Sequence, residues 1–144
     1  MRACLAAIAI AACGTPPVPP DAADPLCFDP QGAVAPTFTN VQRVFTAQCT
    51  NTICHGNFEV SLLAPAYDRI VGKPAVDNPP TTDSCGGTLV APGDPAGSYL
   101  YVKVSSDTPC AGTRMPRNEF AAGVLPDCER ELIRQWIAAG AKND

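Results

Sequence analysis

Hydrophobic residues recur at helical spacing in two segments of the chain. In the first, "VQRVFTAQC", Val41, Val44 and Phe45 follow the i, i+3, i+4 spacing that places side chains on one face of a helix. Thr39 and Asn40 stand directly before this pattern as capping residues. The spacing therefore predicts a helix that begins near residue 40 and delivers the cysteine at position 49.

The second and clearer pattern is "LPDCERELIRQWIAAGA" near the C-terminal end. Four apolar residues fall on one stripe of the predicted helix and should pack inward: Leu132, Ile133, Trp136 and Ile137. Three acidic residues suit the positive N-terminal end of a helix: Asp127, Glu129 and Glu131. Pro126 fits the first turn and Gly140 the C-terminal stop.

Turn-forming residues dominate between these two patterns. Residues 56–97 contain "KPAVDNPP", "SCGG" and "APGDPAG", and only "APAYDRIVG" has a helical composition there. Ser98 is a candidate cap for the short element "SYLYVKV", whose β-branched residues leave helix and strand open, with helix favoured. The expected fold is mainly α, loop-rich and without internal repeats.

The N-terminal segment "MRACLAAIAIAAC" has the composition of an export signal: one Arg, an apolar run, and small residues before a cysteine. It is shorter than the ~20 apolar residues that a membrane-spanning helix needs. Its end, "IAAC", resembles a bacterial lipobox, which implies a lipid on Cys13; a soluble secreted protein cut nearby is the alternative. We therefore expect a signal peptide over residues 1–12, a Pro/Ala-rich tether over 13–36 and a folded domain over 37–144.

The net charge and the number of cysteines limit which compartment and which binding partners suit this chain. Removal of residues 1–12 takes away one Arg and one Cys, which leaves nine Lys plus Arg against 14 Asp plus Glu, and seven cysteines. No basic face for nucleic acid is visible, and this many cysteines indicate an oxidising compartment. Without Cys13, six cysteines could form three disulfides, or two thioethers plus two disulfides. Zinc is a weak alternative because paired C-x-x-C motifs are lacking.

The stretch "CTNTICHG" carries the chain's only histidine, His55, next to Cys54. Haem attachment ordinarily uses C-x-x-C-H, whereas four residues separate Cys49 from Cys54 here. Cysteines five positions apart lie about 140° apart on a helix, so the chain must leave the helix if both are to reach one haem. Alternatively Asn51 occupies the first cysteine position and Cys54 makes a single thioether. A small disulfide between the two cysteines, with His55 on the surface, is the competing interpretation.

Met115, in "GTRMPRNEF", is the only methionine after signal removal. A lone methionine is usually core filler, but this one lies in an irregular segment. A proximal histidine completed by a methionine sulfur is one form of six-coordinate haem iron suited to electron transfer. His55 and Met115 are therefore candidate axial ligands.

Four motifs together, "VFTAQC…CHG", "APGDPAGSYLYVKV", "RMP" and "LPDCERELIRQWIAAGA", resemble the small c-type cytochrome domains of bacterial exported lipoproteins. The resemblance covers residues 41–141 and implies a cytochrome c-like fold around one haem c. It makes Cys49 and Cys54 the thioether attachment points, and His55 and Met115 the iron ligands. Its departure from the family is the spacing at Cys49, which leaves the number of thioethers open. Lys103 could be an alternative ligand or a propionate partner, although a solvated lysine is favoured.

A porphyrin would supply much of the apolar core that this chain, with few aromatic residues, does not. The residues expected to line it are Leu62, Leu63, Leu89, Val90, Leu100, Leu132 and Trp136.

With Cys49 and Cys54 assigned to haem, the remaining four cysteines allow three pairings. We expect Cys85 to pair with Cys110, which would steady the loop before Met115, and Cys27 to pair with Cys128.

The resemblance implies an electron carrier rather than an enzyme. We expect a monomer, held to an envelope membrane by its lipid, facing the periplasm or on the outer membrane, that docks with an unidentified redox partner. A haem-free, disulfide-stabilised lipoprotein with a binding or scaffolding role is the alternative from another class. A haem peroxidase, which needs an open distal site, is a minor one.

Overall fold

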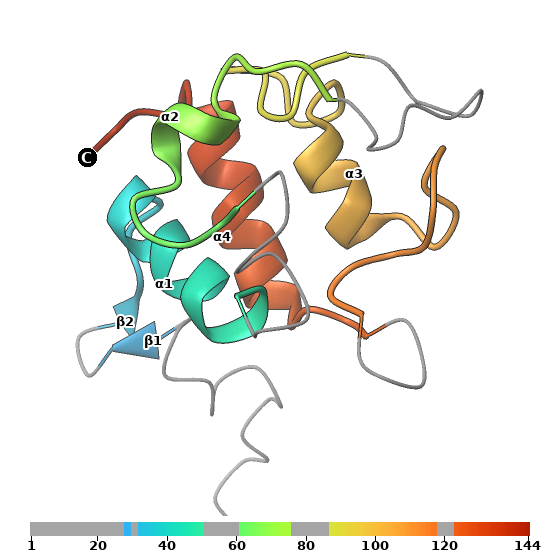
Figure 1. Cartoon of the computed structure of the whole chain (residues 1–144). Coiled ribbons are helices and arrows are strands. Elements are labelled where there is room, and N and C mark those ends of the chain that lie inside the picture. The colour runs from blue at the N-terminus through green and yellow to red at the C-terminus, as the bar shows by residue number, and fades with distance from the viewer. Residues whose placement is uncertain (1–27, 30–31, 51–60, 76–86, 118–122) are drawn as a thin grey trace, which may run out of the picture.

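The computed structural model describes residues 28–29, 32–50, 61–75, 87–117 and 123–144. In these ranges helices predominate, which confirms the mainly α prediction. The helices are α1 (Phe38–Gln48), α2 (Tyr67–Ile70), α3 (Tyr99–Ser105) and α4 (Asp127–Ala138). Strands β1 (Phe28–Asp29) and β2 (Gly32–Ala33) form a small antiparallel pair (Figure 1).

Helix α1 begins slightly earlier than its capping residues predicted. Thr37 is the N-cap, and its side chain accepts a hydrogen bond of 3.4 Å from the Asn40 backbone N–H. The prediction of capping at Thr39 and Asn40 is wrong by two to three residues, because Phe38 already belongs to the helix and is buried. The predicted apolar face of Val41, Val44 and Phe45 is confirmed as buried.

Helix α4 follows its predicted pattern along its whole length. The four residues of the predicted stripe are all buried: Leu132, Ile133, Trp136 and Ile137. Pro126 is the N-cap residue, one position before the helix. Gly140, at φ +98°, donates to the Ile137 carbonyl, and the Ala141 N–H donates to the Trp136 carbonyl. This pair of bonds is a Schellman motif, which explains why the helix stops where glycine was predicted to end it.

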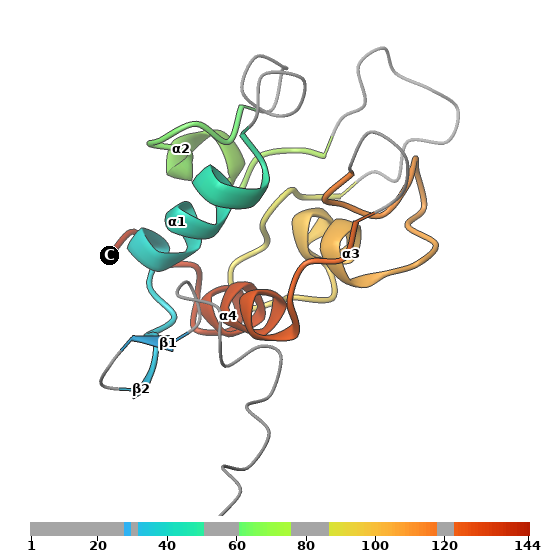
Figure 2. The same cartoon turned by 90° about the horizontal axis from the view of Figure 1, so that it is seen from below.

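Helix α4 is the centre of the packing and contacts both α1 and α3 (Figure 2). Aromatic rings join α1 to its neighbours: the centroid of Phe38 lies 5.4 Å from that of Trp136 and 5.1 Å from that of Tyr67. The core continues from these rings through the buried side chains of α1 and α4 to Leu62, Ala66, Ile70, Val90, Val104 and Leu125.

Between α1 and α3, the described residues 61–75 and 87–98 are connected by backbone pairing rather than by long helices. α2 is only four residues long, which confirms the predicted helical tendency of "APAYDRIVG" in part. The backbones of Val71 and Val90 pair in a parallel bridge, and those of Pro74 and Thr88 in an antiparallel one. A parallel bridge between Thr88 and Ser98 spans the "APGDPAG" turn, which leads into α3.

"SYLYVKV" forms a helix, as favoured from the sequence, but the role of Ser98 differs. Ser98 is at the N-cap position without a side-chain cap bond. Its buried Oγ instead donates to the Asp94 carbonyl at 2.7 Å and accepts from the Ala91 N–H at 2.9 Å. The N-cap position is therefore confirmed, but the hydroxyl closes the preceding turn and makes no cap bond.

The two ends of the described chain both pack onto the helices. Asp144 accepts the Phe38 N–H through Oδ1 at 2.8 Å and the Thr39 N–H through its carbonyl at 2.9 Å, so an acidic residue lies at the positive end of α1. Val34, within the predicted tether, packs against the core. Within the described ranges, no helix combines the length and hydrophobicity required to span a bilayer.

Candidate functional site

An apolar cavity of about 250 Å³ lies among α1, α3, α4 and the loop that carries Met115. This volume is close to the lower end of the ~300–1,000 Å³ typical of small-molecule sites. Its walls are formed by Phe45, Cys49, Leu62, Ile70, Leu89, Tyr99, Leu100, Lys103, Val104, Ala111, Gly112, Met115, Leu125 and Ile133. Most of these side chains are hydrocarbon, so the cavity suits a largely apolar ligand.

Two of the residues predicted to bind haem, Cys49 and Met115, line this one cavity. Cys49 is the C-cap of α1, and its N–H donates to the Phe45 carbonyl at 2.9 Å. The helix thus ends directly before Cys49. Attachment of both Cys49 and Cys54 to one haem would need the chain to leave the helix at this point. Met115 reaches the cavity from the loop after α3 and packs partly buried against the core.

The other predicted site residues, Cys54 and His55, lie outside the described residues. So do Cys13, Cys27 and Cys85. Cys110 and Cys128 are both disulfide-bonded. Their pairing with Cys85 and Cys27 stays a prediction.

Only some of the residues that were predicted to line a porphyrin line this cavity. Leu62, Leu89 and Leu100 line it. Leu63 is 46% exposed, and Val90, Leu132 and Trp136 are buried elsewhere in the core. Sequence reasoning missed Phe45, Ile70, Val104, Leu125 and Ile133 as wall residues. Phe45 and Ile133 belong to the predicted apolar stripes, so the stripes marked them as inward-facing without showing which inward residues meet the cavity.

Lys103 is not the solvated lysine that the sequence favoured. Its Nζ donates to the carbonyls of Ala111 at 2.9 Å and Thr113 at 2.8 Å, and lies 5.8 Å from the centroid of the Tyr99 ring. The Lys103 carbonyl accepts the Met115 N–H at 2.7 Å. An ammonium that donates to carbonyls has no lone pair for iron, so this arrangement does not favour Lys103 as an axial ligand.

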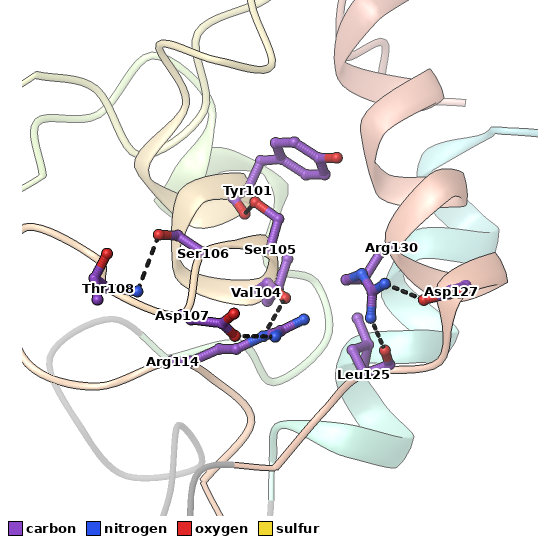
Figure 3. Close-up of polar contacts among 10 residues, drawn as sticks. All are labelled: Tyr101, Val104, Ser105, Ser106, Asp107, Thr108, Arg114, Leu125, Asp127 and Arg130. Atoms are coloured by element: carbon purple, nitrogen blue, oxygen red, sulfur yellow. Dashed lines mark hydrogen bonds and ion pairs between the residues drawn. The ribbon is translucent and has the colours of Figure 1, made fainter.

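Arg114 provides another connection between α3 and the Met115 loop (Figure 3). Its Nε donates to the Val104 carbonyl at 3.2 Å, and its guanidinium pairs with Asp107 at 2.5 Å. The Arg114 side chain is 13% exposed, whereas that of Asp107 is 87% exposed. The Arg114 side chain is therefore largely covered, and its partner Asp107 lies at the protein surface.

The far wall of the cavity is anchored at the start of α4. Arg130 donates to the Leu125 carbonyl at 2.5 Å and pairs with Asp127 (Figure 3). This holds the backbone of Leu125, a wall residue, against the first turn of the helix.

Glu129 lies in the first turn of α4, as predicted, but it is also part of the packing between helices. It is fully buried, and its Oε1 accepts a hydrogen bond of 3.2 Å from Gln48 Nε2. Gln48 directly precedes Cys49, so this contact ties the end of α1 to α4. The sequence pattern of α4 gave no indication of this buried contact, because a carboxylate near a helix N-terminus normally faces water.

The exposed face of α4 carries the clearest electrostatic effect. Hydrogen bonds from Arg134 and then Gln135 lower the pKa of Glu131 to about 2. The same contact raises the pKa of Arg134. Both side chains are more than a third exposed, so the pair stabilises the helix only slightly.

In the described part of the chain, no group of three or more His, Cys, Asp or Glu residues gathers into a metal site. Haem iron does not need such a group, because the protein adds only axial ligands.

The chain matches no protein-family model, no curated protein and no solved structure.

Proposed function

We propose that this chain binds haem c covalently and carries single electrons in the bacterial cell envelope. The observation that carries the proposal is the position of Cys49 and Met115 on the walls of the same apolar cavity. A thiol for attachment and a thioether sulfur for iron thus come from separate elements to one cavity.

The cavity walls fit a haem in chemical character. Aliphatic and aromatic side chains from α1, α3 and α4 would contact the porphyrin faces, as Phe45, Leu100 and Ile133 illustrate. Methionine sulfur is a soft donor that haem iron accepts as an axial ligand. Among the wall residues that the structure describes, Lys103 has the only charged side chain, and its ammonium is bound to loop carbonyls.

Under this proposal each residue has a defined part. Cys54, with or without Cys49, would attach the porphyrin through a thioether, and His55 and Met115 would hold the iron. Bound haem supplies a one-electron couple, whose potential a Met/His ligand pair raises. The apolar walls exclude water from the site, and the contacts of α3 keep Met115 at the wall.

The cellular setting follows from the N-terminal motifs. A lipid on Cys13 and the Pro/Ala-rich tether would hold the domain near an envelope membrane. A haem edge exposed at the surface would serve a redox partner, for which weak and transient docking is expected. Disulfides Cys85–Cys110 and Cys27–Cys128 would stabilise the domain in an oxidising compartment.

Redox titration of the mature protein, purified from a haem-maturing host, tests this function. A haem absorption spectrum that changes reversibly with a one-electron midpoint supports it. A colourless protein with all six remaining cysteines in disulfides would instead favour the haem-free lipoprotein. A pentacoordinate spectrum that responds to peroxide would favour the peroxidase.

A further inference from the structure

Residues Tyr99 and Lys103 lie one helical turn apart on α3 and both contact the loop that ends at Met115. The Tyr99 hydroxyl donates to the Ala111 carbonyl at 3.2 Å, and the Lys103 ammonium donates to the same carbonyl at 2.9 Å. The ammonium also donates to the Thr113 carbonyl at 2.8 Å. Two carbonyls of the loop, those of Ala111 and Thr113, are therefore held by one side chain.

The backbone of Lys103 holds Met115 itself. Its carbonyl accepts the Met115 N–H at 2.7 Å, so the side chain and the main chain of one residue hold three positions of the loop. Hydrogen bonds to a charged donor are worth more than neutral ones, which makes the ammonium the strongest of these connections.

Gly112 lies between the two carbonyls that Lys103 binds. It has φ +64°, and a Cβ built on it would lie 3.1 Å from Lys103 Nζ. Glycine both permits this backbone conformation and leaves room for the ammonium. The loop is thus shaped around the lysine head group.

We propose that Lys103 is a positioning residue that fixes the Met115 loop against α3 and so keeps the methionine sulfur on the cavity wall. The inference rests on the proposed haem site for its purpose, since a fixed sulfur is what an axial ligand needs. The contacts of Lys103 with the loop belong to the protein itself, so their effect on the Met115 amide can be measured without haem.

The test compares variants of the full mature chain purified from a haem-maturing host. Lys103→Leu removes the donors without adding a second sulfur, as methionine would. Lys103→Arg keeps a charged donor, and Lys73→Leu removes a lysine that is exposed on the 71–75 segment. Hydrogen exchange of the Met115 amide is measured against the Trp136 amide in α4 as an internal reference.

Lys103→Leu should speed exchange of the Met115 amide about tenfold or more relative to Trp136, since it removes charge-assisted bonds. In the haem-loaded protein it should also lower the temperature at which the long-wavelength absorption band of methionine-ligated ferric haem disappears. Lys103→Arg should restore much of both effects, and Lys73→Leu should change neither. If Lys103→Leu does not fold, Lys103→Ala, which also removes the donors, gives the same comparison.

Exchange of the Met115 amide in Lys103→Leu or Lys103→Ala within about twofold of wild type would overturn this role of Lys103. The failure of the haem site is distinguishable: wild-type protein would then carry no haem, and amide exchange in that haem-free protein would still decide the role of Lys103.

Discussion

Cys49 and Met115 line one cavity although they come from different elements, the C-cap of α1 and the loop after α3. This relationship is the basis for assigning the two residues to a common ligand. It also gives the methionine a role beyond filling the core, because its side chain borders a cavity instead of being enclosed by other side chains.

The substitution Met115→Leu should separate ligation from packing. Leucine keeps an apolar side chain at the wall but has no sulfur, so the fold should persist while the reduction potential of the haem-loaded protein falls. Potentiometric titration with the ferric absorption spectrum measures this. The control Val124→Leu changes a residue that is 63% exposed and should leave the potential as in wild type. An unchanged potential and spectrum in Met115→Leu would show that another group binds the iron.

The contact between Phe38 and Trp136 should dominate the stability of the α1–α4 packing. Trp136 is 1% exposed, and its Nε1 donates to the Lys142 carbonyl at 2.9 Å. Trp136→Ala should lower the free energy of unfolding by about 3–5 kcal/mol, and Trp136→Phe by about 1–2 kcal/mol. Urea unfolding measures both, with Val124→Ala expected to stay within about 0.5 kcal/mol of wild type. A Trp136→Ala variant as stable as Val124→Ala would contradict this packing.

The Schellman motif at the end of α4 makes Gly140 sensitive to substitution. At φ +98° an alanine is strained, so Gly140→Ala should cost about 1–2 kcal/mol of unfolding free energy. Asparagine tolerates positive φ better, so Gly140→Asn should cost less. Thermal or urea unfolding of the two variants, compared side by side, tests the order. The prediction is contradicted if alanine is tolerated as well as asparagine.

The low pKa of Glu131 predicts a small dependence of stability on acid. Its folded-state pKa of about 2 lies below the ordinary value of 4.5, so its contribution is present above about pH 4.5 and is lost as pH falls toward 2. Because the side chain is half-exposed, Glu131→Gln should cost only about 0.5 kcal/mol or less at pH 7. The difference between wild type and variant should vanish near pH 2 in urea titrations. A difference that grows as pH falls would have the wrong sign.

Sequence reasoning succeeded where stability depends on neighbours along the chain. The stripes of α1 and α4 were visible because inward-facing residues repeat every turn, and Gly140 marked a stop that only local geometry requires. It placed Ser98 and Glu129 at the correct helix ends but did not show that the Ser98 hydroxyl bonds to the preceding turn, or that Glu129 is buried against Gln48. Both side chains are placed by tertiary contacts that no spacing reveals.

The residues of the candidate site also divide into those that the sequence could predict and those that it could not. Residue chemistry alone singled out Cys49, which precedes the Cys54-His55 pair, and Met115, which is the one methionine left after signal removal. The contacts of Lys103 were not predictable, since its partners are backbone carbonyls, which every residue offers. The wall residues were partly missed because an apolar stripe faces both the core and the cavity, and only packing separates the two.

The intact mass of the mature protein, purified from a haem-maturing host and denatured before measurement, tests covalent haem binding most directly. The account predicts a mass increase of one haem that survives denaturation in the wild type and is lost when Cys49 and Cys54 are both replaced by serine. The two single serine variants report whether one or two thioethers form. Wild-type protein without this added mass would contradict the account.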